Sequence, residues 1–290
     1  MLYIILFFIL GLLFGSFLNL ALYRVPKNKS LIFGRSKCDY CNHKLSFTDL
    51  IPLFSYILLK GRCKYCKKRL PVYLPLVEFF SALSFALSYF YAFNIYQGTL
   101  PLQKYIFLVF SLFLSLILVY SFFYDLLYYE IPFKPVIAGY FLWIFYTVFN
   151  FFYYRKVFLQ SLNDSKLGAY LLQTSFLNDR LIFYIKETLT YNLITALLIF
   201  LFLLVLHLVT KGRGMGFGDV YFAPLLALIS GFPVSIVYFF SSFVLGSLYG
   251  LTTIILKKQT LKSRVPFGPF LILGFLLSLT FFKIYTKFFI

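Results

Sequence analysis

Long apolar runs, separated by short polar connections, follow one another along most of this chain. About 20 apolar residues are enough to cross the ~30 Å hydrocarbon core of a membrane. Eight runs approach or exceed that length, and they cover residues 2–23, 72–94, 105–124, 132–152, 190–209, 220–232, 234–256 and 267–288. The sixth run is short, and Gly231-Phe232-Pro233 indicates a tight hairpin between it and the seventh. The pattern predicts an all-α polytopic membrane protein with about eight transmembrane helices.

The amino-acid composition supports the same class. Of the 290 residues, 61% are hydrophobic and only 12% are charged, which is far from the composition of a soluble domain. The first run has no charged residue and no Lys or Arg before it. A cleaved signal peptide has a positive start and a shorter apolar core. We therefore expect residues 1–23 to be retained as the first transmembrane helix.

The net charge of +18 admits two interpretations, a surface for nucleic acid or basic loops beside membrane spans. Twelve of the 27 Lys and Arg residues lie between Arg24 and Arg69, where only Asp39 and Asp49 oppose them. Basic loops next to membrane spans stay on the cytoplasmic side. We prefer this second interpretation, with no nucleic-acid partner, the N-terminus outside and residues 24–71 in the cytoplasm.

All four cysteines lie in this loop, as the pairs Cys38 with Cys41 and Cys63 with Cys66, and 21 residues separate the pairs. A two-residue gap lets both thiolates of a pair face one ion, and the spacing is close to that of four-cysteine zinc sites. In a reducing cytoplasm, metal binding is favoured over disulfides. We predict a structural zinc site, because four sulfur ligands leave no coordination position for substrate. The neighbouring His43 is then a surface residue.

Residues 72–290 form the third predicted domain, which is transmembrane. Its most polar stretch, residues 153–189, lies outside in this topology, where five basic residues are unfavourable, and we interpret it as an interfacial amphipathic segment without chemistry. His207 is expected to be packed or interfacial. A second cytoplasmic loop is indicated by basic residues, namely Lys257, Lys258, Lys262 and Arg264.

Polar residues near the ends of the first two runs leave two interpretations open. Gly15 and Ser16 are small enough for close helix packing, and Asn19 can form a hydrogen bond across helices. Ordinary packing and a functional role are both consistent with this stretch. Glu78 enters the membrane from the cytoplasmic side, either as an acid at the interface or as a buried partner for a substrate or cofactor.

Two acids lie at the same depth in the membrane if successive spans cross it in alternating directions. From a cytoplasmic 24–71 loop, Asp125 at the end of the third run and Asp219 at the start of the sixth both reach the cytoplasmic boundary. Asp219 follows the glycine run Gly214–Gly218, which permits close approach of another backbone. An ionisable group in a membrane segment is a functional-site hypothesis by default. Glu130, in the connection after Asp125, is expected to meet water.

Two carboxyls close together in a site with little water share one proton and titrate as a unit. That arrangement suits aspartic peptide hydrolysis, in which one acid takes a proton from water and the other donates to the scissile carbonyl. No Ser/His/Asp or Cys/His set competes, since the only histidines are His43 and His207 and the cysteines are assigned to metal. Two alternatives stay open: unrelated acids at helix ends, and an ion-coupled transporter.

The chain resembles the type IV prepilin peptidases, or prepilin leader peptidase/N-methyltransferases, which are intramembrane aspartic proteases of the GxGD type. The resemblance rests on short stretches that occur in order through nearly the whole sequence. They are Gly15 to Pro26, the two cysteine pairs, Asp49 to Tyr56, Gly61-Arg62-Cys63, Pro75 to Glu78, Asp125 with Ile131-Pro132, Gly214 to Asp219, and Pro266 to Pro269.

The resemblance implies two activities at the bacterial cytoplasmic (inner) membrane. The first is removal of the basic leader from prepilins and pseudopilins on the cytoplasmic side, with Asp125 and Asp219 as the catalytic acids. The second is methylation of the new N-terminal residue with S-adenosylmethionine. No donor site follows from it, and Gly15, Asn19, Arg24 and Glu78 mark only the region to search. The oligomeric state is left open.

The sequence departs from the family pattern at two positions. Phe133 stands where an acid usually follows Ile-Pro, and Tyr221 stands where a lysine often follows the second aspartate by two residues. We expect these departures to affect substrate contacts and not the reaction class. The rival functions are a zinc-stabilised ion-coupled membrane transporter and a non-enzymatic component of a pilus or secretion machine.

Overall fold

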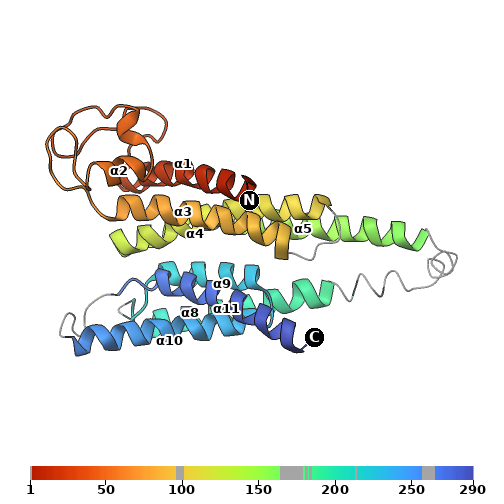
Figure 1. The fold of residues 1–290 in the computed structure, drawn as a ribbon. Helices are drawn as coiled ribbons and strands as arrows, with labels where there is room; N and C mark the ends of the chain where they lie inside the picture. The colour runs from red at the N-terminus through yellow and green to blue at the C-terminus, as the bar shows by residue number, and fades with distance from the viewer. Residues whose placement is uncertain are drawn as a thin grey trace. The chain divides into compact units, whose positions relative to one another are not determined.

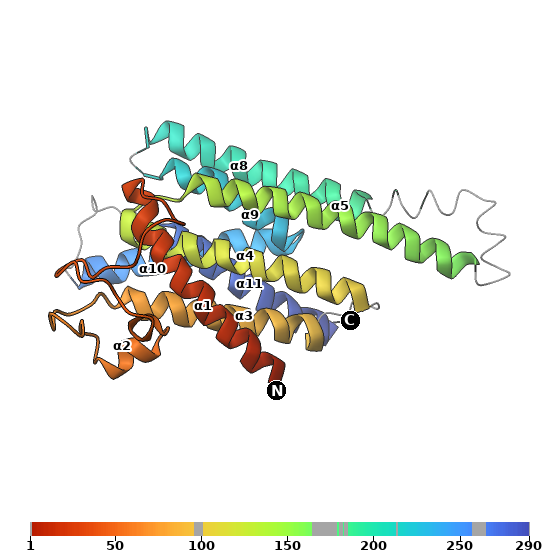
Figure 2. The ribbon, with the colours of Figure 1, turned by 90° about the horizontal axis from the view of Figure 1, so that it is seen from above.

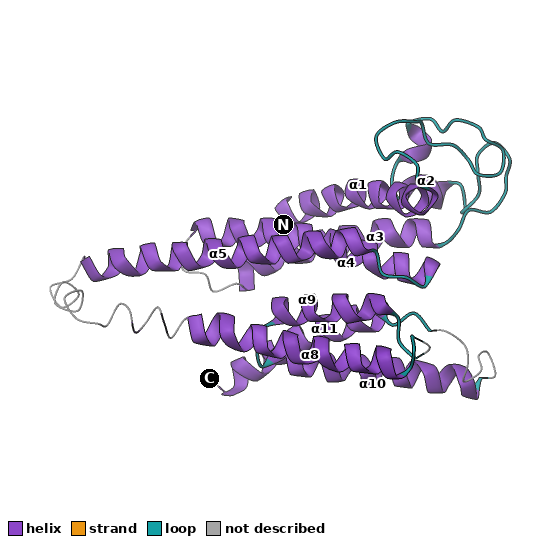
Figure 3. Ribbon diagram, turned by 180° about the vertical axis from the view of Figure 1, so that it is seen from behind, coloured by secondary structure: helices purple, strands orange, loops and turns teal. Residues whose placement is uncertain are grey.

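Helices make up nearly all of the regular structure in this protein. The computed structural model describes residues 2–95, 101–163, 179, 182, 185–212, 214–256 and 265–289. Within these ranges the only strand-like features are two isolated β-bridges in the cysteine-containing loop. Figure 3 shows helices joined by loops, which confirms the predicted all-α class.

The α-helices follow the apolar runs closely (Figure 1). They are α1 (Leu2–Arg24), α2 (Phe54–Leu58), α3 (Tyr73–Phe90), α4 (Pro101–Tyr128), α5 (Phe133–Asn163), α8 (Tyr191–Val209), α9 (Phe217–Ser230), α10 (Val234–Ile255) and α11 (Gly268–Phe289). Short 3₁₀ turns cover Val25–Lys27 and Thr48–Leu50, and π-helical turns cover Tyr91–Ile95 and Lys186–Thr190.

Each of the eight predicted runs corresponds to a helix, but the helices differ in length. In the described part of the chain, six are long and apolar enough to cross a membrane, namely α1, α3, α4, α5, α8 and α10. Phe217–Ser230 and Gly268–Thr280 are shorter apolar helices. Multi-pass membrane insertion is therefore supported, and the number of eight crossings stays a prediction.

The structure describes only part of two polar stretches of the sequence. Helix α5 continues to Asn163 and so includes the first part of the predicted 153–189 segment. Residues 164–178 and most of 180–184 lie outside the described residues. The same holds for the basic residues of the predicted second cytoplasmic loop, Lys257, Lys258, Lys262 and Arg264.

The chain divides into two compact units, of which the first is Met1–Tyr124. Its framework is the pair α1 and α3, which pack closely because glycines face α3. A Cβ on Gly11 would lie 2.5 Å from Ala82 Cα, and one on Gly15 would lie 2.6 Å from Glu78 Cα. Gly15 therefore has the close-packing role that its size predicts. The neighbouring core is apolar and contains Leu18, Leu22, Val77, Tyr120 and Phe123.

The second unit, Asp125–Ile290, is built around α9. Helices α5, α8, α10 and α11 all contact α9, and Figure 2 shows α5 and α8 alongside it. Phe222, Leu225 and Leu226 of α9 are fully buried. Trp143 of α5 donates a hydrogen bond to the Leu228 carbonyl at 3.0 Å, and Tyr238 of α10 donates to the Ala223 carbonyl at 3.1 Å. These contacts fix the helix whose first turn carries Asp219.

The division into units follows contacts, whereas the predicted domains 1–23, 24–71 and 72–290 follow membrane topology. That topological division stays a prediction.

Candidate active site and metal centre

Asp125 lies in the last turn of α4, three residues before the helix ends, and is 4% exposed. The helix stops because Tyr129 takes a left-handed conformation (φ 56°) and returns its N–H to the Asp125 carbonyl at 2.8 Å. The side chain has its own backbone partner, since the Gly268 N–H donates to Asp125 Oδ2 at 2.8 Å. Within the second unit, Asp125 is thus held at its backbone carbonyl by Tyr129 and at its carboxyl by Gly268.

Asp219 lies in the first turn of α9 and is 6% exposed. Gly216 is extended (φ −68°, ψ 148°) and precedes the first helical residue, Phe217. Asp219 Oδ2 lies 3.6 Å from the point where a Cβ on Gly216 would stand, so the carboxyl folds back over the glycine run. The N-terminal end of a helix is a favourable place for a carboxylate.

The structure brings these two acids together. Their carboxyls are close enough to interact electrostatically. The Ile131 side chain packs against the backbone beside each acid. It lies 2.9 Å from a Cβ built on Gly218, next to Asp219, and 3.3 Å from one built on Gly268, which bonds Asp125. Glu130 is exposed, as predicted. The site therefore combines two buried acids from helices distant in sequence.

Glycine is required where the Pro266–Pro269 turn meets Asp125. A Cβ on Gly268 would lie 2.8 Å from Asp125 Oδ2, which is closer than such atoms approach. The glycine therefore permits the N–H of this turn to reach the carboxyl. Sequence reasoning matched the turn to the family but did not assign it a contact with Asp125.

The two departures from the family pattern lie against each other. The rings of Phe133 and Tyr221 meet edge to face, with centroids 5.3 Å apart. Tyr221 also donates its hydroxyl to the Ile131 carbonyl, and Tyr140 donates to the Tyr221 carbonyl at 2.9 Å. These contacts tie the connection after Asp125 to the helix that carries Asp219. Sequence reasoning missed this link, although both departures sit beside the two acids.

His207 shapes the loop before α9. Its Nδ1 lies 2.9 Å from the Met215 carbonyl, and its ring meets Phe217 edge to face at 5.4 Å. The side chain is half-buried, as expected for a packed or interfacial histidine. It supports the glycine run rather than the acids directly.

The four cysteines form one cluster in the first unit. The Sγ atoms of Cys38, Cys41, Cys63 and Cys66 all lie within 4.8 Å of one another, and the Cys38 and Cys66 sulfurs are 3.9 Å apart. Neighbouring sulfurs in a tetrahedral zinc site, at Zn–S of about 2.3 Å, are about 3.8 Å apart. The side chains present therefore fit a four-thiolate metal ion.

The cluster is built from two turns of the same design. In the first, the Cys38 N–H donates to the His43 carbonyl at 3.0 Å, and in the second the Cys63 N–H donates to the Lys68 carbonyl at 2.9 Å. The residue four places after each first cysteine is left-handed, with φ 55° at Asn42 and 57° at Lys67. A β-bridge closes each turn, Lys37 with Lys44 and Arg62 with Arg69.

The backbone of the first turn favours a thiolate at Cys38, the buried cysteine of its pair. Burial alone would raise the pKa of the Cys38 thiol. Hydrogen bonds from the backbone N–H groups of Cys41 and Tyr40 outweigh this effect, and the pKa falls from 9.0 to about 7. His43 is exposed and lies against Tyr65, with ring centroids 3.6 Å apart. It is a surface residue, as predicted.

The search region of the first unit consists of polar groups bonded to backbone. Arg24 is buried and donates to the carbonyls of Ser30, Phe33 and Gly34 at 2.8–2.9 Å. Asn19 Nδ2 donates to the Leu74 carbonyl at 2.9 Å. Glu78 Oε2 accepts the Leu53 N–H at 2.8 Å. Asn19, Arg24 and Glu78 line one cavity, while Gly15 stands behind it in the contact between helices α1 and α3.

Comparison with known proteins places the chain in a family. Residues 9–92 match the model of the Bacterial Peptidase A24 N-terminal domain. A Prepilin leader peptidase/N-methyltransferase from Pseudomonas putida is 30% identical over an alignment of 285 positions, which covers 91% of this chain and 85% of the relative. This chain belongs to the prepilin leader peptidase/N-methyltransferase family.

Other members of the prepilin leader peptidase/N-methyltransferase family extend the likeness. The protein of that name from Bacillus subtilis is 28% identical over 271 residues, 93% of this chain and 91% of the relative. The one from Myxococcus xanthus is 42% identical over 84 residues, 29% of this chain and 25% of the relative. No solved structure matches the chain. The sequence resemblance to this family is thus confirmed along nearly the full length.

We expect the purified protein to carry about one metal ion per chain, held by the four thiolates. Cys63→Ser should remove most of the bound metal, because it breaks a buried position of the cluster. The measurement is elemental mass spectrometry of protein in detergent. His43→Ala is the matched control and should keep its metal. Full metal content in Cys63→Ser, or equal loss in both variants, would contradict the assignment.

Proposed function

We propose that this chain cleaves the basic leader peptide from type IV prepilins and pseudopilins, with Asp125 and Asp219 as its catalytic pair. We propose in addition that it methylates the new N-terminal residue with S-adenosylmethionine as donor. The observation that carries the first activity is the pair of buried carboxyls from α4 and α9, in a chain of this family. The second activity is supported by the names of its relatives.

The chemistry follows from two carboxyls that hold one proton between them. The ionised acid takes a proton from water, and the resulting oxygen attacks the scissile carbonyl. The protonated acid donates its proton to the carbonyl oxygen, and a proton then passes to the amine as the peptide bond breaks. The Gly268 N–H bonds to Asp125 Oδ2, which leaves more acceptor positions for water or substrate at the other oxygen of this carboxyl.

The proposed orientation places the pair where the inner leaflet of the bacterial inner membrane meets the cytoplasm, with the N-terminus outside. The basic 24–71 loop supports it, because such loops stay cytoplasmic. A prepilin has an apolar helix in the membrane and a positive leader on the cytoplasmic side. Its scissile bond therefore lies at the depth proposed for Asp125 and Asp219.

We assign zinc to the cysteine cluster, in a structural role. Four thiolates match the preference of this ion, and a closed site leaves no position for substrate. The ion would hold together two turns that are 21 residues apart in the sequence. Bound there, it would stabilise the loop that covers the ends of α1 and α3.

Replacing either acid by its amide tests the peptidase. Asp125→Asn and Asp219→Asn should each reduce leader cleavage by about 10³-fold or more, because an amide cannot exchange the proton. Asp125→Asn keeps an oxygen for the Gly268 N–H, so the turn stays in place. The measurement is co-expression with a candidate prepilin, with the size and N-terminal mass of the product as readout.

Glu130→Gln is the matched control for the two amide variants, since Glu130 is exposed. It should cleave as the wild type does. Full cleavage by either aspartate variant would exclude the dyad. Ion flux in proteoliposomes with no cleavage by the wild type would favour the transporter instead. A wild-type product with an unmodified N-terminus, in the presence of S-adenosylmethionine, would remove the methyltransferase half.

Gly268→Ala tests the backbone contact on Asp125. The added Cβ would press on Asp125 Oδ2 and displace the carboxyl, so we expect cleavage to fall by about 10²-fold. Gly250→Ala is the control, because nothing lies within 4 Å of a Cβ there. Rates are measured on purified enzyme with a synthetic prepilin. Equal rates for the two variants would show that the Gly268 contact does not position the acid.

A further inference from the structure

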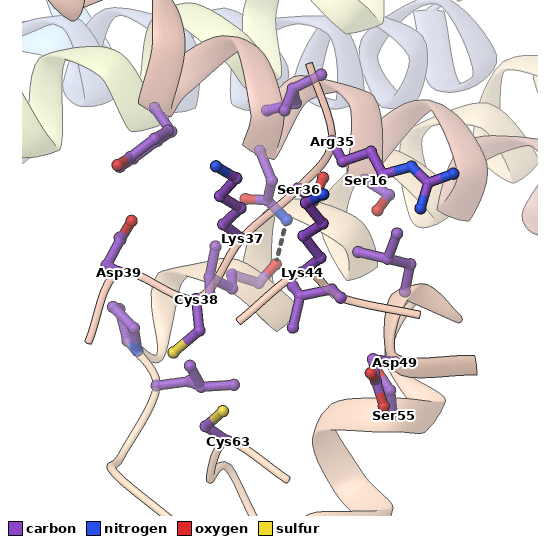
Figure 4. A pocket seen from close by; sticks show the side chains of 18 of the residues that line it. Ser16, Arg35, Ser36, Lys37, Cys38, Asp39, Lys44, Asp49, Ser55 and Cys63 are labelled. Atoms are coloured by element: carbon purple, nitrogen blue, oxygen red, sulfur yellow. Dashed lines mark hydrogen bonds between the residues drawn. The ribbon is translucent and has the colours of Figure 1, made fainter. Parts of the chain in front are cut away.

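The first unit contains a cavity of about 1010 Å³ between α1, the start of α3 and the cysteine-containing loop. Its volume is at the upper end of the range for sites that hold small molecules. Figure 4 shows side chains around it, with Lys37 and Lys44 extending from the loop. All of its lining residues belong to this unit.

One end of the cavity is fixed by Arg24. Its guanidinium donates to three backbone carbonyls of residues 30–34 and so folds the start of the loop over the end of α1. Three of its N–H donors are used in this way, and Arg24 forms a wall of the cavity. Other basic groups that line the cavity come from the loop, such as Lys37 and Lys44.

Asn19, one of the residues that line the cavity, carries an unsatisfied acceptor. Asn19 Nδ2 is used by the Leu74 carbonyl, which fixes the orientation of the amide. Asn19 Oδ1 is buried and has no hydrogen-bond partner among the residues that the structure describes. A buried acceptor without a donor is unfavourable, and an N–H or O–H supplied by a bound molecule would relieve that cost.

A carboxyl without a charged partner lies beside it. In the described part of the chain, the groups that interact with Glu78 are the Leu53 N–H and the side chains of Ser16 and Asn19, all of them uncharged. Leu53 adopts φ 59°, a conformation that is unfavourable for leucine. Such backbone strain persists where the surroundings require it, and here it aims the N–H at Glu78. The acid is thus positioned but not neutralised.

From these groups we infer that the cavity is the binding site for the methyl donor, S-adenosylmethionine, with Glu78 and Asn19 receiving its cationic and hydrogen-bond-donor groups. This assignment rests on the proposed methyltransferase function. The donor carries an ammonium, a sulfonium and ribose hydroxyls, which suit a carboxylate next to an orphan acceptor. It also carries a carboxylate, which suits the lysines of the loop. The cleaved amine, as an alternative occupant, is an outcome of the test below.

Calorimetric titration of the full-length protein in detergent with S-adenosylmethionine tests the site. Glu78→Gln keeps an acceptor for the Leu53 N–H and removes the charge, so the dissociation constant should rise about tenfold or more. Asn19→Ala should weaken binding as well. Metal content of each variant reports whether the first unit is folded.

Matched controls come from the same residue types. Asn94 is exposed and bonds only within its own helical segment, so Asn94→Ala should bind the donor like the wild type. Glu130→Gln, an exposed acid of the second unit, should do the same.

The outcomes separate this inference from the proposed function. If the wild type leaves the pilin N-terminus unmethylated, the methyltransferase proposal itself fails. If it methylates, but metal-loaded Glu78→Gln and Asn19→Ala bind the donor unchanged, only the assignment of the cavity is overturned. If these variants keep the dissociation constant for the donor but show a raised KM for the pilin amine, the cavity belongs to the methyl acceptor instead. The inference would also be contradicted if the wild type methylates the pilin but binds no donor when the pilin is absent.

Discussion

The candidate site depends on a glycine backbone N–H that comes close enough to bond a buried carboxyl. Asp125 and Asp219 are both nearly inaccessible in an apolar unit, and burying charge without partners is strongly unfavourable. The partners here are main-chain groups: the Gly268 N–H for Asp125, and the backbone of Gly216 for Asp219. Because Gly268 has no side chain, its peptide can reach the acid.

The same strategy recurs in the first unit. Arg24 is satisfied by three carbonyls, Glu78 by the Leu53 N–H, and Asn19 by the Leu74 carbonyl. In each case a polar side chain near a helix end is held by the backbone of another segment rather than by an opposite charge. Where that satisfaction is incomplete, as at Asn19 Oδ1, a ligand site is the natural interpretation.

Local patterns in the sequence were enough to predict the helices and to single out the acids and cysteines. Apolar runs and the CxxC spacing are short-range signals, so the cysteine cluster and the helix bounds follow from them within a few residues. The Tyr221–Ile131 and Gly268–Asp125 bonds join residues 90 and 143 positions apart, and periodicity does not report such pairs. The extension of α5 to Asn163 was missed because that stretch is polar.

Disulfide cross-linking between positions 125 and 219 tests most directly whether the two side chains meet. The chain would carry Asp125→Cys and Asp219→Cys, with a protease site inserted between residues 164 and 178. After mild oxidation and cleavage, the two fragments should stay joined on a non-reducing gel and separate on reduction. Fragments that separate, or that stay joined equally in the single Asp219→Cys variant, would contradict the account.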